Sequence, residues 1–133
     1  MYQWQKQIQR IVDEIDNCIK NYDNGALTLH HLSHMLGYSE FYTTRKFKEI
    51  SGMPFRDYLR LRRLAFALKE VRDSTKSLLG GGDIAFDHGF SSHEAFTRAF
   101  KGTYGITPSD YRKIRNLLFS VQRSMRLTAT FSV

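Results

Sequence analysis

The chain has 133 residues, enough for one compact domain or for two very small ones that share a helix, and too few for two large domains. Hydrophobic residues make up 41% and charged residues 25%, proportions that exclude a disordered or membrane-embedded chain. Lysine and arginine number 20 against 13 acidic residues, and the net charge of +7 favours a polyanionic partner, because each neutralised phosphate releases a counterion.

The first predicted element is an amphipathic helix over residues 3–22. Its apolar residues recur at helical spacing and are Ile8, Ile11, Val12, Ile15 and Ile19. Cys18 lies on the same side and is expected to be a small buried core residue; as the only cysteine it excludes an intramolecular disulfide and a thiolate metal site. With no signal-peptide-like start and no apolar run of ~20 residues, we expect a cytoplasmic protein without a membrane segment.

A first helix-turn-helix is predicted to complete the segment 1–53. Thr28 is expected to cap a helix with one apolar stripe, Gly37 to end it, and Ser39 to cap the next helix. The apolar stripe consists of Leu29, Leu32 and Leu36. In the second helix, the inner face is predicted to hold Thr43, Phe47 and Ile50, and the outer face to hold Phe41, Thr44, Arg45 and Lys48.

Residues 54–73 are predicted to form one long linker helix, with Pro54 at or just before its first position, where a missing N–H costs little. Such a helix spans about 28 Å, at ~1.5 Å per residue. Because this is near the ~34 Å of one DNA turn, two flanking reading helices would be spaced to enter successive major grooves.

An internal repeat predicts a second helix-turn-helix in residues 74–118. Residues 43–58, TTRKFKEISGMPFRDY, align at one offset with residues 96–111, FTRAFKGTYGITPSDY, so that Arg45 matches Arg98. Upstream, Gly37-Tyr38-Ser39 corresponds to Gly89-Phe90-Ser91, with an extra residue just after the turn of the second copy. Its inner face is predicted to hold Phe96, Phe100 and Tyr104, and its outer face His93, Glu94, Thr97, Arg98 and Lys101.

Three successive glycines, Gly80–Gly82, interrupt the second copy. Without these glycines Leu78 would lie three residues before Ile84, as Leu29 lies three before Leu32, so we interpret the triplet as an insertion into the repeat. Because glycine disfavours helix by ~1 kcal/mol per residue, we expect the next helix to start only at about Asp83. A final helix is predicted from Pro108, capped by Thr107, to about Leu118. Residues 119–133 then form a tail with partly strand-like alternation, interpreted as the start of an effector domain absent from this chain, a linker, or added residues.

The run DIAFDHGFSSHEAFTRAFKGTYGITPSDYRK resembles the signature of the AraC/XylS transcription regulators, and LTLHHLSHMLGYSEFYTTRKFKEISGMPFRDYLRLRRL resembles the less strict first unit of the same domain. The resemblance covers about residues 6–113, and the glycine insertion is its clear departure. It implies an all-α fold of about seven helices, in which two helix-turn-helix subdomains flank a linker helix. It also implies sequence-specific binding to double-stranded DNA in two adjacent major grooves, and recruitment of RNA polymerase by an activator.

By position, the resemblance implies base contacts from Phe41, Thr44 and Arg45 in the first unit and from His93, Glu94, Thr97 and Arg98 in the second. The chemistry agrees, because arginine donates two hydrogen bonds to guanine, phenylalanine packs on a thymine methyl, and glutamate accepts from cytosine N4. Phosphate contacts are assigned to Ser39, Lys46, Lys48 and Lys101. As this fragment, the chain is expected to be monomeric and to need no cofactor.

Several alternatives stay open at this stage. For either arginine the alternative is an ion pair with a surface carboxylate, and for the lysines the alternative is simple solvation. A helical protein-interaction or RNA-binding module is the main rival function, although the phenylalanines sit on inner faces rather than on stacking platforms. No catalytic grouping occurs at usable spacing, so no enzyme is expected. His30 and His34 are the one well-spaced histidine pair, and without a convergent carboxylate or thiolate no metal site is expected.

Overall fold

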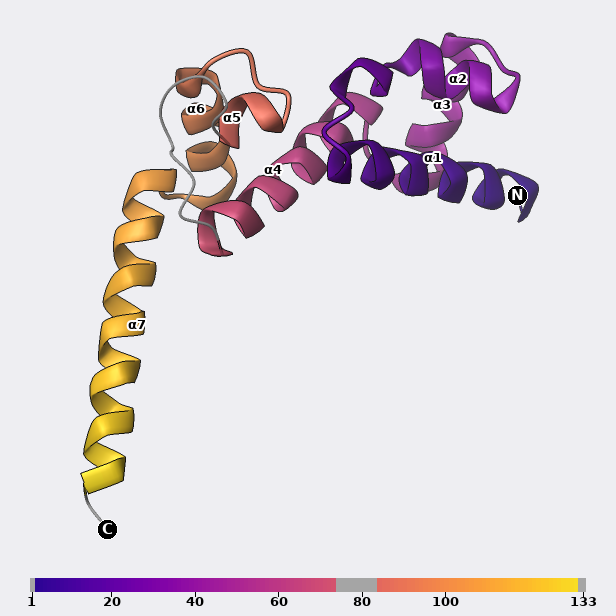
Figure 1. Cartoon of the computed structure of the whole chain (residues 1–133). Coiled ribbons are helices and arrows are strands. Elements are labelled where there is room, and N and C mark those ends of the chain that lie inside the picture. The colour runs from indigo at the N-terminus through magenta and orange to yellow at the C-terminus, as the bar shows by residue number, and fades with distance from the viewer. Residues whose placement is uncertain (1, 74–83, 132–133) are drawn as a thin grey trace. The chain divides into compact units, whose positions relative to one another are not determined.

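The computed structural model describes residues 2–73 and 84–131, with side chains at 3–73 and 84–125. Every element in this part of the chain is helical, which confirms the predicted all-α class (Figure 1). In chain order the elements are α1 (Tyr2–Lys20), the 3-10 turn η1 (Asn24–Ala26), α2 (Leu29–Leu36), α3 (Glu40–Ser51), α4 (Phe55–Asp73), α5 (Ile84–Asp87), α6 (His93–Tyr104) and α7 (Pro108–Phe131). Gly80–Gly82 and Asp83 lie outside the described residues.

The chain divides into two compact units, and the division falls inside α4. Unit 1 comprises Met1–Ala67 together with Asp87–Gly89, and unit 2 comprises Leu68–Phe86 together with Phe90–Val133. Unit 1 contains the helix-turn-helix of α2 and α3, and unit 2 contains α6 and most of α5, whose last residue Asp87 and the following turn belong to unit 1.

The core of unit 1 is built on the predicted apolar stripe of α1. Ile11, Ile15 and Ile19 are almost completely buried, and Cys18 is 3% exposed, so the expectation of a buried cysteine is confirmed. Phe47 of α3 is buried against this stripe and contacts the rings of Phe55 and Tyr58 edge-on, at centroid distances of 5.7 and 5.4 Å. This packing holds α3 by its inner side and leaves its other side exposed.

Two polar arrangements complete unit 1. Arg62 of α4 donates from Nε and Nη2 to the two carboxylate oxygens of Asp16 of α1, both at 3.0 Å. Asn24 Nδ2 donates to the carbonyl of Asp87 at 3.2 Å. Gly89 has φ of +82°, a conformation that favours glycine, and a Cβ there would lie 2.8 Å from Asn24 Oδ1 and 3.0 Å from Arg63 Cζ, so these two side-chain ends would have to shift to admit one.

The core of unit 2 is a series of aromatic contacts. Phe90, Phe96, Phe100 and Tyr104 contact one another in succession, with ring centroids 4.9–5.7 Å apart, and Phe96 and Phe100 are completely buried. Tyr111 of α7 contacts Phe100 at 6.3 Å. The predicted inner face of α6 is therefore confirmed for both phenylalanines.

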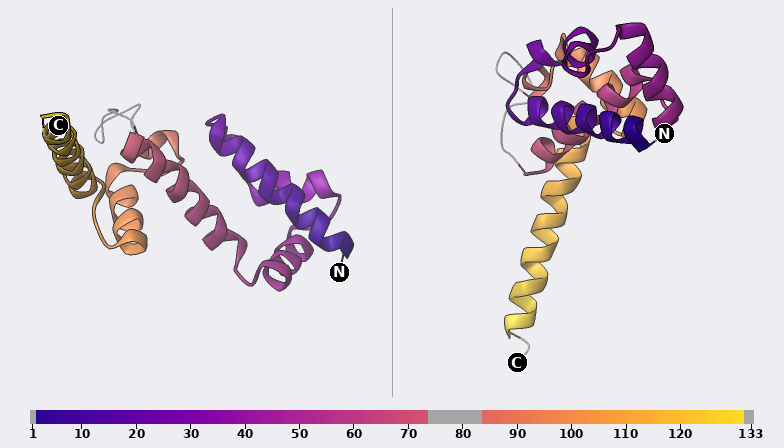
Figure 2. Two further views of the ribbon diagram at one scale, coloured as in Figure 1. Left: turned by 90° about the horizontal axis from the view of Figure 1, so that it is seen from below. Right: turned by 90° about the vertical axis from the view of Figure 1, so that its right-hand side faces the viewer.

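Helix α7 differs from its prediction. It continues to Phe131, so the expected end near Leu118 and the strand-like interpretation of the tail are wrong through that residue. The physical reason is that no glycine or proline follows Pro108, and an established helix propagates through residues that do not break it. In Figure 1 and in the right-hand view of Figure 2 the C-terminal half of α7 extends away from the other helices of unit 2.

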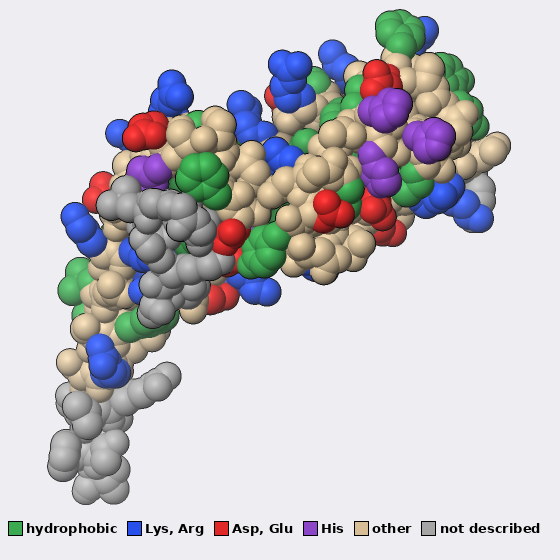
Figure 3. Space-filling view, turned by 45° about the horizontal axis from the view of Figure 1, so that its top comes forward, with side chains coloured by type: hydrophobic (Ala, Val, Ile, Leu, Met, Phe, Trp, Pro, Cys, Tyr) green, Lys and Arg blue, Asp and Glu red, His purple; other side chains and the backbone are tan. Residues whose placement is uncertain are grey.

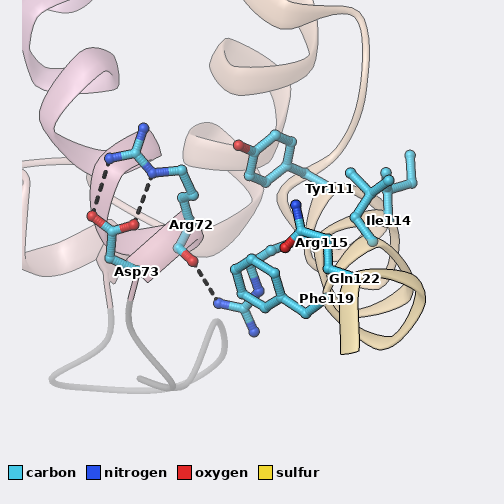
Figure 4. A pocket seen from close by; sticks show the side chains of 8 residues that line it. Arg72, Asp73, Tyr111, Ile114, Arg115, Phe119 and Gln122 are labelled. Atoms are coloured by element: carbon cyan, nitrogen blue, oxygen red, sulfur yellow. Dashed lines mark hydrogen bonds and ion pairs between the residues drawn. The ribbon is translucent and has the colours of Figure 1, made fainter. Parts of the chain in front are cut away.

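Helix α7 has exposed apolar side chains both before and after its predicted end at Leu118. Ile114, Leu117, Leu118 and Met125 are 47%, 65%, 56% and 66% exposed. Between α7 and the end of α4 lies an open pocket of about 400 Å³, where Arg115 Nη1 donates to the carbonyl of Arg72 at 2.8 Å and the rings of Tyr111 and Phe119 form part of the wall (Figure 4).

The C-terminal end of α1 also differs from its prediction. The helix ends at Lys20, two residues earlier than predicted, and Tyr22 takes a left-handed conformation with φ of +56°. A non-glycine residue in that region interrupts the helical hydrogen-bond series. In the described residues, no helix combines the length and apolar character needed to cross a membrane.

Candidate nucleic-acid interface

Unit 1 presents a helix-turn-helix whose predicted caps are confirmed. Thr28 Oγ1 accepts from the backbone N–H of His31 at 3.0 Å, and Ser39 Oγ accepts from that of Tyr42 at 3.1 Å. Gly37 has φ of +79° and joins α2 to α3, as a left-handed helix end requires. The hydroxyl hydrogen of Ser39 is left for another acceptor, because the cap uses only an oxygen lone pair.

The outer face of α3 carries the three side chains predicted to contact bases. Phe41 is 77% exposed, Thr44 is half-buried, and the Arg45 side chain is 65% exposed. On the opposite side Thr43 and Phe47 are buried, so the predicted division of this helix into two faces is confirmed for them.

An open apolar groove of about 330 Å³ lies on this outer face. It is lined by Leu29, Glu40, Phe41, Thr44 and Arg45. Sequence analysis placed Leu29 in one apolar stripe with Leu32 and Leu36 and did not predict that it lines a surface groove. Leu32 is completely buried, whereas Leu29 in the first turn of α2 is half-exposed and forms one wall of the groove.

Arg45 does not stand alone on the surface. Its Nε lies 3.4 Å from Oε1 of Glu49, one turn further along α3. Lys46 Nζ donates to the other carboxylate oxygen of Glu49 at 3.2 Å, and this hydrogen bond is the main reason that the pKa of Glu49 lies below its usual value. The alternative in which Arg45 pairs with a carboxylate is therefore found in the free protein.

Unit 2 presents α6 in the same way, with one correction to the sequence alignment. The cap is Ser92, whose Oγ accepts from the N–H of Ala95 at 3.0 Å, and not Ser91, which the alignment paired with Ser39. The extra residue of the second copy thus lies between the Gly89 turn and the cap. Measured from the capping serines, Arg45 and Arg98 occupy the same position on their helices.

The two helices also end alike. Both have 12 residues, and they end at Gly52 and Gly105, whose φ and ψ are +78°, +5° and +78°, +4°. The glycine N–H groups donate to the carbonyls of Lys48 and Lys101, each at 2.8 Å. The internal repeat therefore specifies two copies of one helical frame.

The outer side chains of α6 differ among themselves in exposure. Glu94, Arg98 and Lys101 are exposed, and among the described residues no carboxylate is paired with Arg98. His93 and Thr97 are half-buried, and His93 Nε2 lies 3.4 Å from Thr97 Oγ1. The structure thus brings these two predicted base-contacting groups together, with part of their polar capacity already used.

Comparison with known proteins shows the family to which this pair of helix-turn-helix units belongs. A family model described as a helix-turn-helix domain matches residues 32–114. Regulatory protein SoxS of Escherichia coli (strain K12) is 33% identical over 104 residues, which are 78% of this chain and 94% of that protein. The chain belongs to the AraC-type helix-turn-helix family of DNA-binding transcription regulators.

Solved structures agree with the AraC-type fold. A transcriptional regulator with an AraC-type DNA-binding domain from Chromobacterium violaceum matches with a TM-score of 0.72, covering 86% of this chain and 96% of that one at 23% identity. The DNA-binding domain of AdpA, solved in complex with a target DNA, matches with a TM-score of 0.60, covering 72% and 90% at 20% identity.

Within this AraC-type frame the predicted phosphate-contacting lysines fall into two groups. Lys48 and Lys101 are exposed on α3 and α6. Lys46 is 27% exposed, and its Nζ lies 6.0 Å and 5.7 Å from the ring centroids of Trp4 and Tyr42 as well as beside Glu49. Lys46 therefore contacts side chains of unit 1, which its spacing in the sequence did not indicate.

The histidines of α2 form a group on the surface of unit 1 (Figure 3). His30 stacks on His34 at 6.4 Å, and its Nδ1 lies 3.6 Å from Oε1 of Glu40; His31 Nε2 lies 3.8 Å from Glu14. Glu40 approaches only His30 of this pair, because the tight turn brings the start of α3 against α2. Across the described ranges, no set of three or more such side chains is arranged to hold a metal ion.

Proposed function

We propose that this AraC-type chain recognises a specific duplex sequence, with α3 and α6 as its two reading helices. The observation that supports this most directly is the repeated frame, in which a serine cap, a 12-residue helix and a left-handed glycine present an exposed arginine at one equivalent position in each unit. Helices held by their inner faces keep their outer residues available for base edges in a major groove.

The proposed target is a site that spans two successive major grooves on one side of the duplex. Each unit supplies one reading helix, and α4 is a single uninterrupted helix of 19 residues that belongs in part to both units. Because one chain carries both helices, we propose that it binds as a monomer to a site without two-fold symmetry.

Side-chain roles follow from exposure and chemistry. We assign base contacts to Phe41, Thr44 and Arg45 in unit 1, and to Glu94 and Arg98 in unit 2, with His93 and Thr97 as less exposed neighbours. Lys48, Lys101 and the Ser39 hydroxyl are assigned to phosphate, where they add affinity and fix register but carry no sequence information.

Selection of duplexes from a random pool, followed by a salt titration on the selected and scrambled duplexes, tests this proposal. We expect a preferred sequence, a footprint over about two turns, and a steep fall in binding with salt. Arg45→Ala and Arg98→Ala should each relax preference at a different position, by about five- to 150-fold. Arg10→Ala, which removes an exposed charge from α1, serves as the control and should leave the preferred sequence unchanged.

Two outcomes would contradict the proposal. Equal binding to selected and scrambled duplexes would leave only electrostatic attraction of a basic protein. Tighter binding to single-stranded RNA than to duplex DNA would favour the RNA-binding alternative.

We further propose that the DNA-bound chain activates transcription through RNA polymerase in the cytoplasm, as the likeness to AraC/XylS regulators suggests. Transcription reconstituted with purified polymerase and a template carrying the selected site tests this. We expect more transcript with the wild-type chain than with Arg45→Ala, and no change on a template whose site is scrambled; equal transcript in all three would contradict activation.

A further inference from the structure

We propose that unit 1 recognises two adjacent base pairs, one presenting a pyrimidine C5-methyl group and the other a guanine. The methyl group occupies the groove between Leu29 and Phe41, and Arg45 binds the guanine while Glu49 positions it. This inference rests on the proposed function and adds the chemical group of the DNA that binds in the groove on α3.

The lining of the groove selects a methyl group over a phosphate. The wall is almost entirely apolar, with Leu29 of α2 facing the strongly exposed ring of Phe41 of α3. Its polar rim includes Glu40, whose carboxylate repels a phosphate and lies close to His30. In the major groove, the apolar group that a base pair offers is the C5-methyl of thymine, or of 5-methylcytosine.

The orientation of Arg45 suits guanine. Its contact with Glu49 runs through Nε, at 3.4 Å, and the side chain is 65% exposed. The contact at Nε uses one of the five N–H donors of the guanidinium group, and the terminal N–H groups are the donors that we propose bind O6 and N7 of guanine together. Glu49 is a carboxylate at neutral pH like any exposed glutamate, and its hydrogen bond with Lys46 lowers its pKa further.

The spacing of Phe41 and Arg45 along α3 suits contacts with neighbouring base pairs. Phe41 and Arg45 are four residues apart on one helix face, where Cβ atoms lie about 5–6 Å from each other. Neighbouring base pairs stack ~3.4 Å apart, and their major-groove edges are separated further by the helical twist. Since both side chains line the same groove, one step of the duplex meets both.

The test removes single groups from the DNA rather than from the protein. In the duplex selected by the wild-type chain, each thymine is replaced in turn by uracil, which deletes only the methyl group. We expect one position, next to a guanine, at which the replacement weakens binding about three- to fivefold, the worth of one buried methyl. Phe41→Ala should bind the thymine and uracil duplexes equally.

Two further arms separate the sources of the methyl group and test the guanine. At the same position cytosine should bind more weakly than 5-methylcytosine. Replacing the adjacent guanine by 7-deazaguanine, which lacks the N7 acceptor, should weaken wild-type binding about five- to tenfold and leave Arg45→Ala unaffected. Lys48→Ala is the matched control on the same helix: its overall affinity should fall, while its thymine-to-uracil ratio stays at the wild-type value.

The outcomes distinguish the two proposals. If a preferred duplex exists but no thymine is sensitive to uracil, or if Phe41→Ala retains the full sensitivity, the groove assignment is wrong and specific DNA recognition stands. If no duplex is preferred at all, both fail. Phe41 and Arg45 are exposed, so an unchanged melting temperature of each variant excludes loss of folding as the cause.

Discussion

Arg45 and Glu49 form an ion pair across one turn of α3, with the contact made by the arginine Nε at 3.4 Å. An exposed pair of this kind contributes little to stability, so its consequence is the direction in which it holds the guanidinium group. We therefore predict that Glu49→Gln lowers the discrimination between guanine and 7-deazaguanine while the melting temperature stays unchanged, as measured by binding titrations with both duplexes.

The control for this prediction is Lys46→Gln, which removes the other partner of Glu49. It should leave the discrimination ratio unaltered. An equal loss of discrimination in the two variants would mean that Glu49 acts through the local charge rather than by positioning Arg45.

The bidentate contact between Asp16 and Arg62 predicts a stability effect within unit 1. Both side chains are about one third exposed or less, at 26% and 36%, so solvent screening reduces the interaction. Asp16→Asn should lower the free energy of unfolding by about 1 kcal/mol, with a smaller effect at high salt. Asp13→Asn, on the exposed side of the same helix, should change it by less than half as much; equal losses from denaturant titration would refute the assignment.

Alanine substitutions at Gly37 and Gly89 distinguish the cost of backbone conformation from the cost of contact with neighbouring side chains. Both have φ near +80°, but a Cβ at Gly37 meets nothing within 4 Å, whereas at Gly89 it meets Asn24 and Arg63. Gly37→Ala should cost about 1–2 kcal/mol from backbone conformation alone, and Gly89→Ala should cost about 1–3 kcal/mol more. Thermal unfolding measures both, and equal costs would show that the neighbours of Gly89 give way freely.

Replacement by alanine should lower the stability of the protein at one phenylalanine of α3 but not at the other. Phe47 is completely buried among aromatic rings, so Phe47→Ala should lower the free energy of unfolding by about 3–5 kcal/mol. Phe41 is 77% exposed, so Phe41→Ala should leave stability within about 0.5 kcal/mol and change only DNA binding. A comparable loss of stability in both variants would contradict the two faces assigned to this helix.

Cys18 should be chemically inert in the folded protein. Burial, and then the hydrogen bond to Glu14 and its charge, raise the pKa of the thiol to about 11. At pH 8.5 its alkylation should be about two orders of magnitude slower than in the urea-unfolded chain, by mass spectrometry. Because the folded state holds the thiol proton more tightly, stability should also fall as pH rises above about 9, where the unfolded thiol ionises, towards 11.

The residues that sequence analysis placed correctly are those whose role is local. Thr28, Ser39 and Gly37 act within one turn of the backbone, and Phe47 and Phe100 follow helical periodicity, so capping and spacing rules suffice to predict them. The internal repeat then allowed the ends and faces predicted for α3 to be predicted for α6 as well.

The residues that it missed depend on how separate elements meet. Leu29 follows the apolar stripe of α2 and packs in part against the core, but it lies in the first turn of the helix and also lines the groove with residues of α3. Glu40 reaches His30 only because the turn folds α3 back against α2, and Ser92 replaces Ser91 as the cap because the turn at Gly89 takes up one more residue. No pattern within a single helix contains this information.

The matching ends of α3 and α6 have an evolutionary consequence. The residues that start and stop each helix, Ser39 with Gly52 and Ser92 with Gly105, are different from those on its outward surface. Substitutions at Phe41, Thr44 or Arg45 are therefore expected to leave the start and end of α3 intact. Under the proposed function, the base preference of one unit can then change while the other unit keeps its own.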